Sequence, residues 1–555
     1  MRWIFIAFLL SPASSLFGQG LTLSDVRTVV AQAVQEAKIV SPDRVVAVVD
    51  REGFVLAVWD VNGGSAPSAT DVARVVSAAG AAAFLSSDQH AFTTRTAGFI
   101  IQQNFPPGVD NRPNGPLVGV NFSSMAFSDT NKYKAPSPAN TFPAPPVPGV
   151  NDLGSATPAD FFRSVPFTAL ALSGNPGGVP LFKSGRLVGG VAVVGYADPA
   201  VLGFDTTFQA SDNERIALSG QAGFRPDPVF DGSNVLIDGI RLAYQVGTGS
   251  NATVANPAGY LANPANGLPV IFADIDGMPA SGDDAAVDYS PKASPPPVVY
   301  PNTFGLIGTN ATPGELRSAI RADPKAGLIN GQARLNAAEV REILRLAAER
   351  STITRAGIRL PRGQIARVWI TVVSNPATDQ EEPAVLGTYR TPDATIFSWD
   401  VATQKARTAI FFSRGTERAA NGPPRAFSCR SVGWLSQSMY PPGIKGTPAG
   451  PLNGFQPIFS VKDFGGAVGF QVPLTPINTN IPNGITIFPG GFPLYRNGVL
   501  IGAIGVSGDG IEQDDIVGAA GAANFLAPNG SRADDFVYEN ARIPYAKFPR
   551  AATSF

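Results

Sequence analysis

The sequence predicts a mixed α/β protein in which one unit, built of helices and an antiparallel sheet, occurs twice. Segments with helical apolar spacing alternate with β-branched runs, and this alternation is typical of that class. Short motifs of the first half also recur in the second half with one offset of 335 residues. Phe92–Gly98, Phe105–Gly108 and Gly115–Leu117 correspond to Phe427–Gly433, Tyr440–Gly443 and Gly450–Leu452. We interpret the chain as a tandem duplication with long insertions in each copy.

Each copy opens with the same sequence of predicted elements. Thr22 and Asp25 fit a capping box before an apolar helix, and so do Asn336 and Glu339. A strand, a hairpin partner and a second helix are then predicted in both copies. In the first copy they are Val45–Val49, Phe54–Trp59 and Thr70–Leu85; in the second they are Trp369–Val373, Ala384–Tyr389 and Thr403–Phe412.

The segment Phe492–Phe525 closes the second copy. It is predicted to form a short strand, a turn at Arg496–Gly498 and a second strand ending at Val506. The Asn-Gly pair supplies the positive φ angles that tight hairpins need. An acidic loop then leads into a small-residue helix. Val179–Phe224 is the counterpart in the first copy, but it lacks the acidic loop.

Composition limits the functions that the chain could have. Charged residues make up 15% of the 555 residues and the net charge is −1, so electrostatics give no reason to expect binding to nucleic acid or to an anionic membrane. Arg2, the apolar run Trp3–Leu10 and the small residues after it have the order of a secretory signal peptide. We therefore expect residues 1–20 to be a signal peptide and the mature protein to be secreted or periplasmic, without a membrane span.

The remaining chain divides into three predicted parts. Residues 21–225 form the first copy, 226–331 a Gly- and Pro-rich linker or insertion, and 332–555 the second copy with the better-kept motifs. Within the linker we expect strands at Val235–Tyr244 and Leu268–Phe272, a short helix at Pro313–Arg321 and an extended spacer at Ser294–Tyr300.

With these motifs in view, the repeated unit resembles the GlcG/HbpS family of haem-binding or haem-degrading domains. The resemblance rests on the capped first helix, the helix around Lys405–Ala409 and the closing segment from Pro493 to Asp514. It implies a profilin-like fold, with an antiparallel sheet of about five strands flanked by helices. It also implies haem binding or redox sensing, and assembly into dimers or larger rings. Within this chain the two copies would form a pseudo-dimer, and a homo-oligomer is a further possibility.

We place the candidate ligand site in the second copy. Its residues are Lys405, Arg407, Thr408, Gly505, Ser507, Gly508, Glu512 and Asp514. An Arg side chain presents a planar fork that matches a carboxylate, such as a haem propionate. The first copy has Ala78, Gly80 and Ala81 at the first three positions.

Each part of this site has an alternative interpretation. The basic cluster could be a solvated helix face, and the glycine-rich Gly505–Gly508 segment is expected to turn close to the ligand. Glu512, Asp514 and Asp515 could act as acid/base groups or could simply favour a helix N-terminus.

Haem iron would need an axial ligand, and the sequence offers few. His90 is the only histidine and is expected in a solvated loop; Met125, Met278 and Met439 are expected to be packing residues. Cys429, the only cysteine, is either a buried small residue or a thiol activated by Arg430. Asp274–Gly277 with Asp283, Asp284 and Asp288 could hold a hard cation, although the spacing lacks the bidentate Glu of the twelve-residue calcium loop.

The sequence thus favours an exported binding protein for haem or another small anionic ligand, with redox or metabolite sensing as a role and no assigned catalytic residue. Two other classes stay open. One is an enzyme that acts on small oxidised metabolites through Glu512–Asp515, and the other is a structural assembly module whose ligand site has been lost.

Overall fold

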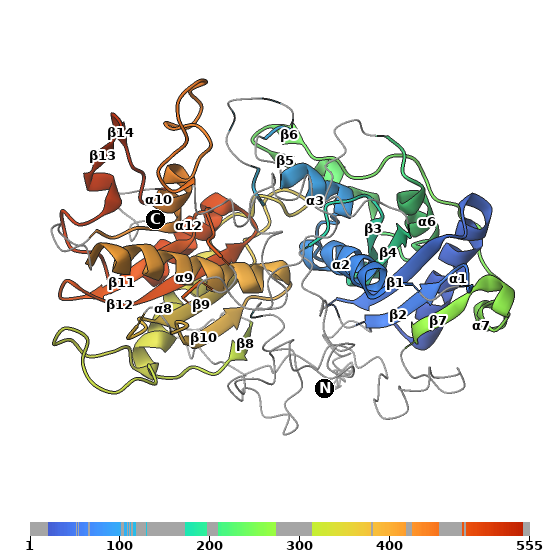
Figure 1. The fold of residues 1–555 in the computed structure, drawn as a ribbon. Helices are drawn as coiled ribbons and strands as arrows, with labels where there is room; N and C mark the ends of the chain where they lie inside the picture. The colour runs from blue at the N-terminus through green and yellow to red at the C-terminus, as the bar shows by residue number, and fades with distance from the viewer. Residues whose placement is uncertain are drawn as a thin grey trace, which may run out of the picture.

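In the computed structural model, two units lie side by side, each built around one five-stranded sheet (Figure 1). The structure describes residues 20–101 (without 52, 54, 65 and 66), positions 105–107, 109, 112, 115–117 and 129, then 172–196, 209–272, 314–378, 381–417, 425–453, 480–481 and 484–547. The predicted signal peptide, the Asp274–Asp288 segment, the Ser294–Tyr300 spacer, Met125 and Met278 fall outside the described residues.

The first sheet has the strand order β3-β4-β1-β2-β7, and all neighbouring strands are antiparallel. Its strands are β1 (Arg44–Asp50), β2 (Val55–Asp60), β3 (Gly178–Lys183), β4 (Arg186–Gly195) and β7 (Leu268–Phe272). The helices of this unit are α1 (Leu23–Val40), α2 (Ala69–Leu85), α3 (Thr94–Ile100), α6 (Asp212–Gly220) and α7 (Pro257–Leu261).

The second sheet has the equivalent order β11-β12-β9-β10-β8, again with antiparallel neighbours. Its strands are β8 (Glu315–Ser318), β9 (Val368–Ser374), β10 (Val385–Arg390), β11 (Gly491–Arg496) and β12 (Val499–Gly508). The helices are α8 (Ala337–Thr352), α9 (Phe397–Glu417), α10 (Cys429–Leu435) and α12 (Ile511–Gly521). The predicted fold class is therefore confirmed.

Helices cover both faces of each sheet, which explains why the central strands are apolar along their whole length. In β1, Val45 and Val49 point into the core beneath α2, whereas Val46 and Val48 pack toward α1 and α6. In the second unit α9 covers one face, and α8 and α12 cover the other. Strands buried on both faces read as continuous hydrophobic runs.

The predicted capping boxes and the predicted hairpin turn are present in the structure. The capping boxes of Thr22 with Asp25 and of Asn336 with Glu339 are both formed. The β11–β12 hairpin turns through Asn497 and Gly498 at φ angles of 46° and 82°. Within the described residues, none of the helices is long and apolar enough to cross a membrane.

The segment 226–331 differs most from its prediction. Its strand β7 forms one edge of the first sheet, and its strand β8 forms the corresponding edge of the second. The predicted helix Pro313–Arg321 is wrong, since Glu315–Ser318 is β8. The predicted strand Val235–Tyr244 is instead a short hairpin of β5 (Leu236–Ile237) and β6 (Ile240–Arg241). A matching hairpin, β13 (Val537–Tyr538) and β14 (Ala541–Arg542), follows the second unit.

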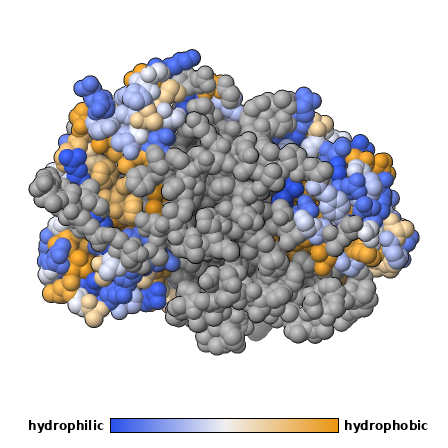
Figure 2. Space-filling model, viewed as in Figure 1, coloured by the Kyte–Doolittle hydropathy of each residue, from blue (hydrophilic) through white to orange (hydrophobic). Residues whose placement is uncertain are grey.

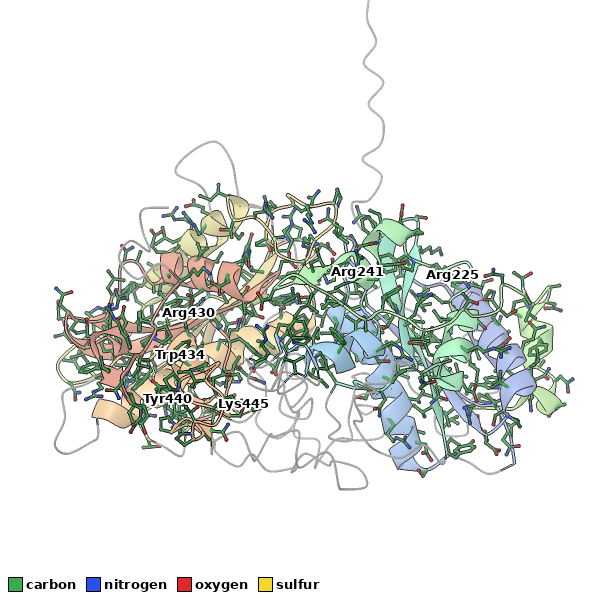
Figure 3. All side chains as sticks on the ribbon, turned by 90° about the horizontal axis from the view of Figure 1, so that it is seen from above. Arg225, Arg241, Arg430, Trp434, Tyr440 and Lys445 are labelled. Carbon is green, nitrogen blue, oxygen red and sulfur yellow. The ribbon has the colours of Figure 1, made fainter. Side chains whose placement is uncertain are left out.

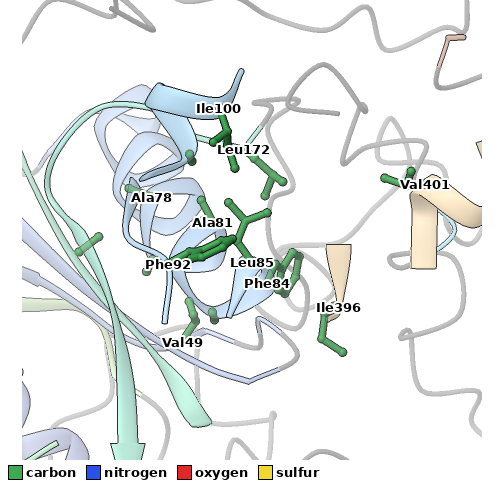
Figure 4. Packing of buried hydrophobic residues seen from close by; sticks show 14 of the residues in the cluster. Val49, Ala78, Ala81, Phe84, Leu85, Phe92, Ile100, Leu172, Ile396 and Val401 are labelled. Carbon is green, nitrogen blue, oxygen red and sulfur yellow. The ribbon is translucent and has the colours of Figure 1, made fainter. Parts of the chain in front are cut away.

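An apolar contact and a charged contact join the two units. Phe84 at the end of α2 and Ile396, directly before α9, belong to one hydrophobic cluster, and both are labelled in Figure 4. Beside them, the N–H of Leu360 donates to the carbonyl of Gln89 at 3.0 Å, and the N–H of Asp88 donates to Oδ1 of Asp393 at 3.0 Å. On the face seen in Figure 2, hydrophilic and hydrophobic residues are mixed over both units.

Candidate functional site

Lys405 is buried on α9 and forms an ion pair within the second unit. Its Nζ lies 2.8 Å from Oδ2 of Asp514 and donates to the carbonyl of Val506, also at 2.8 Å. Burial raises the pKa of Asp514 to about 6, although the ammonium of Lys405 opposes this shift. The solvated-face alternative is therefore wrong for Lys405, and the two charges neutralise each other inside the protein.

Arg407 is also buried, with 1% of its side chain exposed. Its Nη1 lies 2.6 Å from Oδ2 of Asp129, its Nη2 lies 3.1 Å from Oδ1 of the same carboxylate, and Nη2 also contacts Glu382. The two Nη atoms thus bind a carboxylate end-on, in a bidentate geometry expected for a ligand carboxylate, but the carboxylate belongs to the protein.

Arg407 is part of a longer polar face on α9, formed by Asp400, Gln404, Arg407 and Thr408, which are all buried. Gln404 donates to Asp400 at 2.6 Å and accepts a hydrogen bond from the hydroxyl of Thr486 at 3.0 Å. The hydroxyl oxygen of Thr408 accepts the N–H of Thr486 at 2.9 Å. The sequence prediction identified two members of this face but not its extent, because Asp400 and Gln404 look like ordinary helix residues.

Gly505, Ser507 and Gly508 lie in strand β12, so the expected turn at these residues is wrong. They pair with β9 as Gly505–Thr371, Ser507–Trp369 and Gly508–Val368. A Cβ at Gly505 would lie 1.9 Å from the carbonyl oxygen of Ala402. That glycine is therefore required for the close approach of α9 to the sheet. The chain turns only after Gly508.

The acidic residues lie in the first turns of α12, where each contacts a cation. Glu512 and Asp515 pair with Arg430 of α10 at 2.8 and 2.9 Å, and Lys547 pairs with Glu512 at 2.9 Å. Burial tends to raise the pKa of Glu512, but Lys547 and Arg430 outweigh it and hold that pKa below its usual range. With Lys405 on Asp514, all three carboxylates take part in ion pairs.

Some ion pairs of the second unit also occur in the first unit, and others do not. The contact of Arg430 with Asp515 has a counterpart in Arg95 and Glu214, 2.8 Å apart in the first unit. In both units the carboxylate also accepts a backbone N–H from a residue further along the chain. Val246 donates to Glu214 in the first unit, and Lys547 donates to Asp515 in the second. This ion pair occurs in both units, so we regard it as part of the architecture.

The pair of Lys405 and Asp514 has no such counterpart. A Cβ at Gly178 would lie 2.5 Å from the carbonyl of Ala78, and one at Gly491 would lie 2.5 Å from the carbonyl of Lys405. Ala78 and Lys405 are therefore equivalent in space, as the sequence comparison predicted. Gly177 likewise approaches Asn213 where Gly490 approaches Asp514, so both charges are missing from the first unit.

Two of the residues weighed as axial ligands, His90 and Cys429, are buried, whereas Met439 is only half-buried. His90 was expected in a solvated loop, but this prediction is wrong, since the residue is 0% exposed. Its Nδ1 contacts the Ser87 hydroxyl at 2.8 Å, and its Nε2 contacts the Leu85 carbonyl at 2.9 Å. Burial lowers the pKa of His90 to about 3. Cys429 donates its thiol to the carbonyl of Lys405, and burial raises the pKa of that thiol to about 12. Cys429 is thus the buried small residue of the first alternative.

One buried group escaped the sequence prediction. The rings of Trp369 and Trp399 stack 4.6 Å apart at an angle of 14°. Arg317 of β8 lies over Trp399 at 4.8 Å, and Arg390 lies over Trp369 at 5.2 Å. The cation–π contact of Arg317 attaches the edge strand β8 to the start of α9. No local pattern could indicate these contacts, since the four residues come from four separate elements.

The outer side of the second unit carries further aromatic and basic side chains. Figure 3 shows Arg430, Trp434, Tyr440 and Lys445 on this unit, and Arg225 and Arg241 on the first. Tyr440 is buried, and its hydroxyl donates to the carbonyl of Tyr538 at 3.2 Å. Among the described residues, no group of three or more His, Cys, Asp or Glu side chains is arranged to hold a metal ion.

The fold and these contacts define a two-unit α/β protein with a charged, buried centre in the second unit. Residues 367–523 match the family model described as haem degrading protein HbpS-like. The matched segment lies within the second unit, from the start of β9 to the residues just after α12.

The solved structures to which this chain is similar include the following two. The crystal structure of a PduOC:heme complex is 22% identical, covers 35% of this chain and 98% of its own, and has a TM-score of 0.23. The Klebsiella pneumoniae protein ORFY, of family model DUF336, is 20% identical, covers 36% of this chain and 96% of its own, and has a TM-score of 0.22. A comparison with curated proteins found no match.

Proposed function

We propose that the second unit is a non-covalent binding module for haem or for another small planar ligand that carries carboxylates. The observation that carries this proposal is the match of residues 367–523 to a family model described by haem degradation. The bidentate, end-on contact of Arg407 with a carboxylate supports it, because that guanidinium has the geometry to bind a propionate.

The described residues fit the carboxylates of haem better than its iron. The imidazole of His90, the thiol of Cys429 and the hydroxyl of Tyr440 are all buried and hydrogen-bonded to protein groups. None of these three side chains fits an iron atom in this arrangement. We therefore derive no step through iron, and we propose that the protein recognises the porphyrin and its carboxylates.

Titration of the purified protein with haemin and with iron-free protoporphyrin IX tests this proposal. We expect both to bind, with a shift of the haemin Soret band and quenching of tryptophan fluorescence at similar concentrations. A variant with Arg407→Met should bind both more weakly, whereas the surface variant Arg345→Met should bind as the wild type does. The absence of any spectral change at micromolar haemin would end the haem proposal. Binding of haemin alone would show that an iron ligand lies elsewhere in the chain.

The two other classes receive less support from the geometry. An enzyme that uses Glu512, Asp514 or Asp515 would need a carboxylate available to substrate, but all three form ion pairs with cations. If neither porphyrin binds, a structural assembly module becomes the better interpretation of the second unit.

We also propose that the protein is exported and that it senses its ligand. The order of basic, apolar and small residues at the N-terminus supports export. N-terminal sequencing of the protein from the periplasmic or extracellular fraction tests it. A mature chain that begins near Gly20 is expected, and a cytoplasmic chain that retains Met1 would contradict export. Sensing would appear as a ligand-dependent change in the protease sensitivity of the junction between the units.

A further inference from the structure

The carboxylate bound by Arg407 does not come from the second unit. Asp129 follows α3 in the chain and lies 278 positions before Arg407. Both side chains are 1% exposed, so the contact is sealed from solvent. A residue of the first unit thus supplies the counter-charge at the centre of the second.

Asp129 contacts α9 through both its side chain and its backbone. Its carboxylate lies in the fork of Arg407, and its backbone N–H donates to Oδ1 of Asp400 at 2.9 Å. Asp400 and Arg407 are seven positions apart on α9, which places them two turns apart on one face. The polar face of α9 therefore has a cation for a carboxylate and an acceptor for a neighbouring N–H.

The receptor is present in only one of the two units. The first unit has Gly80 where the second has Arg407, and the equivalence of Ala78 with Lys405 in space supports this alignment. A buried guanidinium without a counter-charge is costly, so Arg407 requires a carboxylate in the folded protein. Glu382 contacts Nη2 of Arg407, and its side chain is 37% exposed, so it is more solvated than the carboxylate of Asp129.

We propose that the polar face of α9 is a carboxylate receptor that the chain fills with its own Asp129, and that this side chain competes with the carboxylate of the ligand. The identity of that ligand rests on the proposed function, but the receptor does not. The first unit would then set the affinity of the second, since displacement of Asp129 accompanies binding.

Small carboxylates test the receptor without reference to haem. In the full-length chain with Asp129→Ala, acetate should raise the melting temperature in a saturable way compared with chloride at equal ionic strength. The wild type and the double variant Asp129→Ala with Arg407→Met should show no such rise. A folded Asp129→Ala protein that responds equally to acetate and chloride would overturn the receptor.

Haemin tests the competition. We expect Asp129→Ala to bind haemin at least about tenfold more tightly than the wild type. The ligand then no longer has to displace a charge-assisted contact, which corresponds to about this factor in Kd. If Asp129→Ala does not fold, Asp129→Asn keeps the shape and one acceptor while removing the charge, and it should also bind more tightly. Equal affinity in wild type and folded variants would overturn the competition but leave the haem proposal intact. Stabilisation by acetate without haemin binding to any variant would leave the receptor and remove the haem proposal.

Discussion

Lys405 and Asp514 form an ion pair almost completely removed from solvent, with Nζ 2.8 Å from Oδ2 and side chains 1% and 3% exposed. The first unit has Ala78 and Asn213 at the equivalent places, so it lacks both partners together. The first unit therefore shows how the same fold packs when neutral residues replace this ion pair.

This comparison of the two units leads to a double-variant experiment. Lys405→Ala or Asp514→Asn alone should lower the free energy of unfolding by about 3–5 kcal/mol, because each leaves a buried charge without its partner. The double variant recreates the pair found in the first unit, and it should cost clearly less than the two single changes added together. Chemical denaturation of the four proteins measures this coupling. Additive costs would mean that the two charges act independently.

The same pair gives the stability a pH dependence. Burial raises the pKa of Asp514 in the folded protein to about 6 from 3.8. The folded protein then binds the proton more tightly than the unfolded chain does. The resulting stabilisation is present below pH 3.8 and is lost as the pH rises through about 6. We expect the stability difference between wild type and Asp514→Asn to change over this range, as measured by unfolding at several pH values. A difference that stays constant would contradict the raised pKa.

His90 should act with the opposite sign. Burial lowers its pKa to about 3 from 6.5, so the folded protein holds a neutral imidazole that the unfolded chain would protonate. This term destabilises the protein as the pH falls from 6.5 toward 3. As the only histidine, His90 gives one set of imidazole NMR signals. They should not move between pH 8 and pH 5, and a titration near pH 6.5 would show that the ring is solvated.

Arg359 should be a strong determinant of how the units are joined. Its side chain is 0% exposed and contacts Asp509 and Asp393 of its own unit, and its Nη1 lies 3.3 Å from Oε1 of Gln89 in the first unit. Arg359→Met should lower the free energy of unfolding by about 3–5 kcal/mol, since the buried carboxylate of Asp509 loses the cation that it contacts. Arg345→Met is the matched control, with a surface pair worth at most about 1 kcal/mol. Equal costs for the two variants would contradict this assignment.

Cys429 should be inert in the folded protein. Its thiol is 0% exposed, and burial raises the pKa of that thiol to about 12, so almost no thiolate forms at pH 8. Ellman's reagent should therefore detect no thiol in the native protein and one after denaturation. Rapid reaction of the native protein would show that Arg430 activates the thiol after all.

The sequence predicted the parts of the fold that depend on neighbouring residues. The capping boxes at Thr22 and Asn336 and the turn at Asn497 need only residues within a few positions of one another. Strand β8 could not be predicted in this way, because four residues become a strand only when the edge of β10 is available to pair with them.

The candidate site shows the same limit. Lys405 and Arg407 could be selected from the sequence, but their burial and their partners could not. Asp129 and Asp514 lie 278 and 109 positions away, and only the packed units bring them to α9. His90 was expected in solvent because Ser86–Gln89 is polar, yet Ser87 and the carbonyl of Leu85 satisfy its ring inside the protein.

The edge strands β7 and β8 have a practical consequence for anyone who wishes to express one unit alone. A fragment that stops at residue 225 would expose the backbone of β2, and one that begins at residue 332 would expose that of β10. Unpaired strand edges recruit other chains, so such fragments should precipitate as aggregates. Fragments that end after Phe272 or begin before Glu315 keep each edge covered, and these are the boundaries at which soluble single units should be sought.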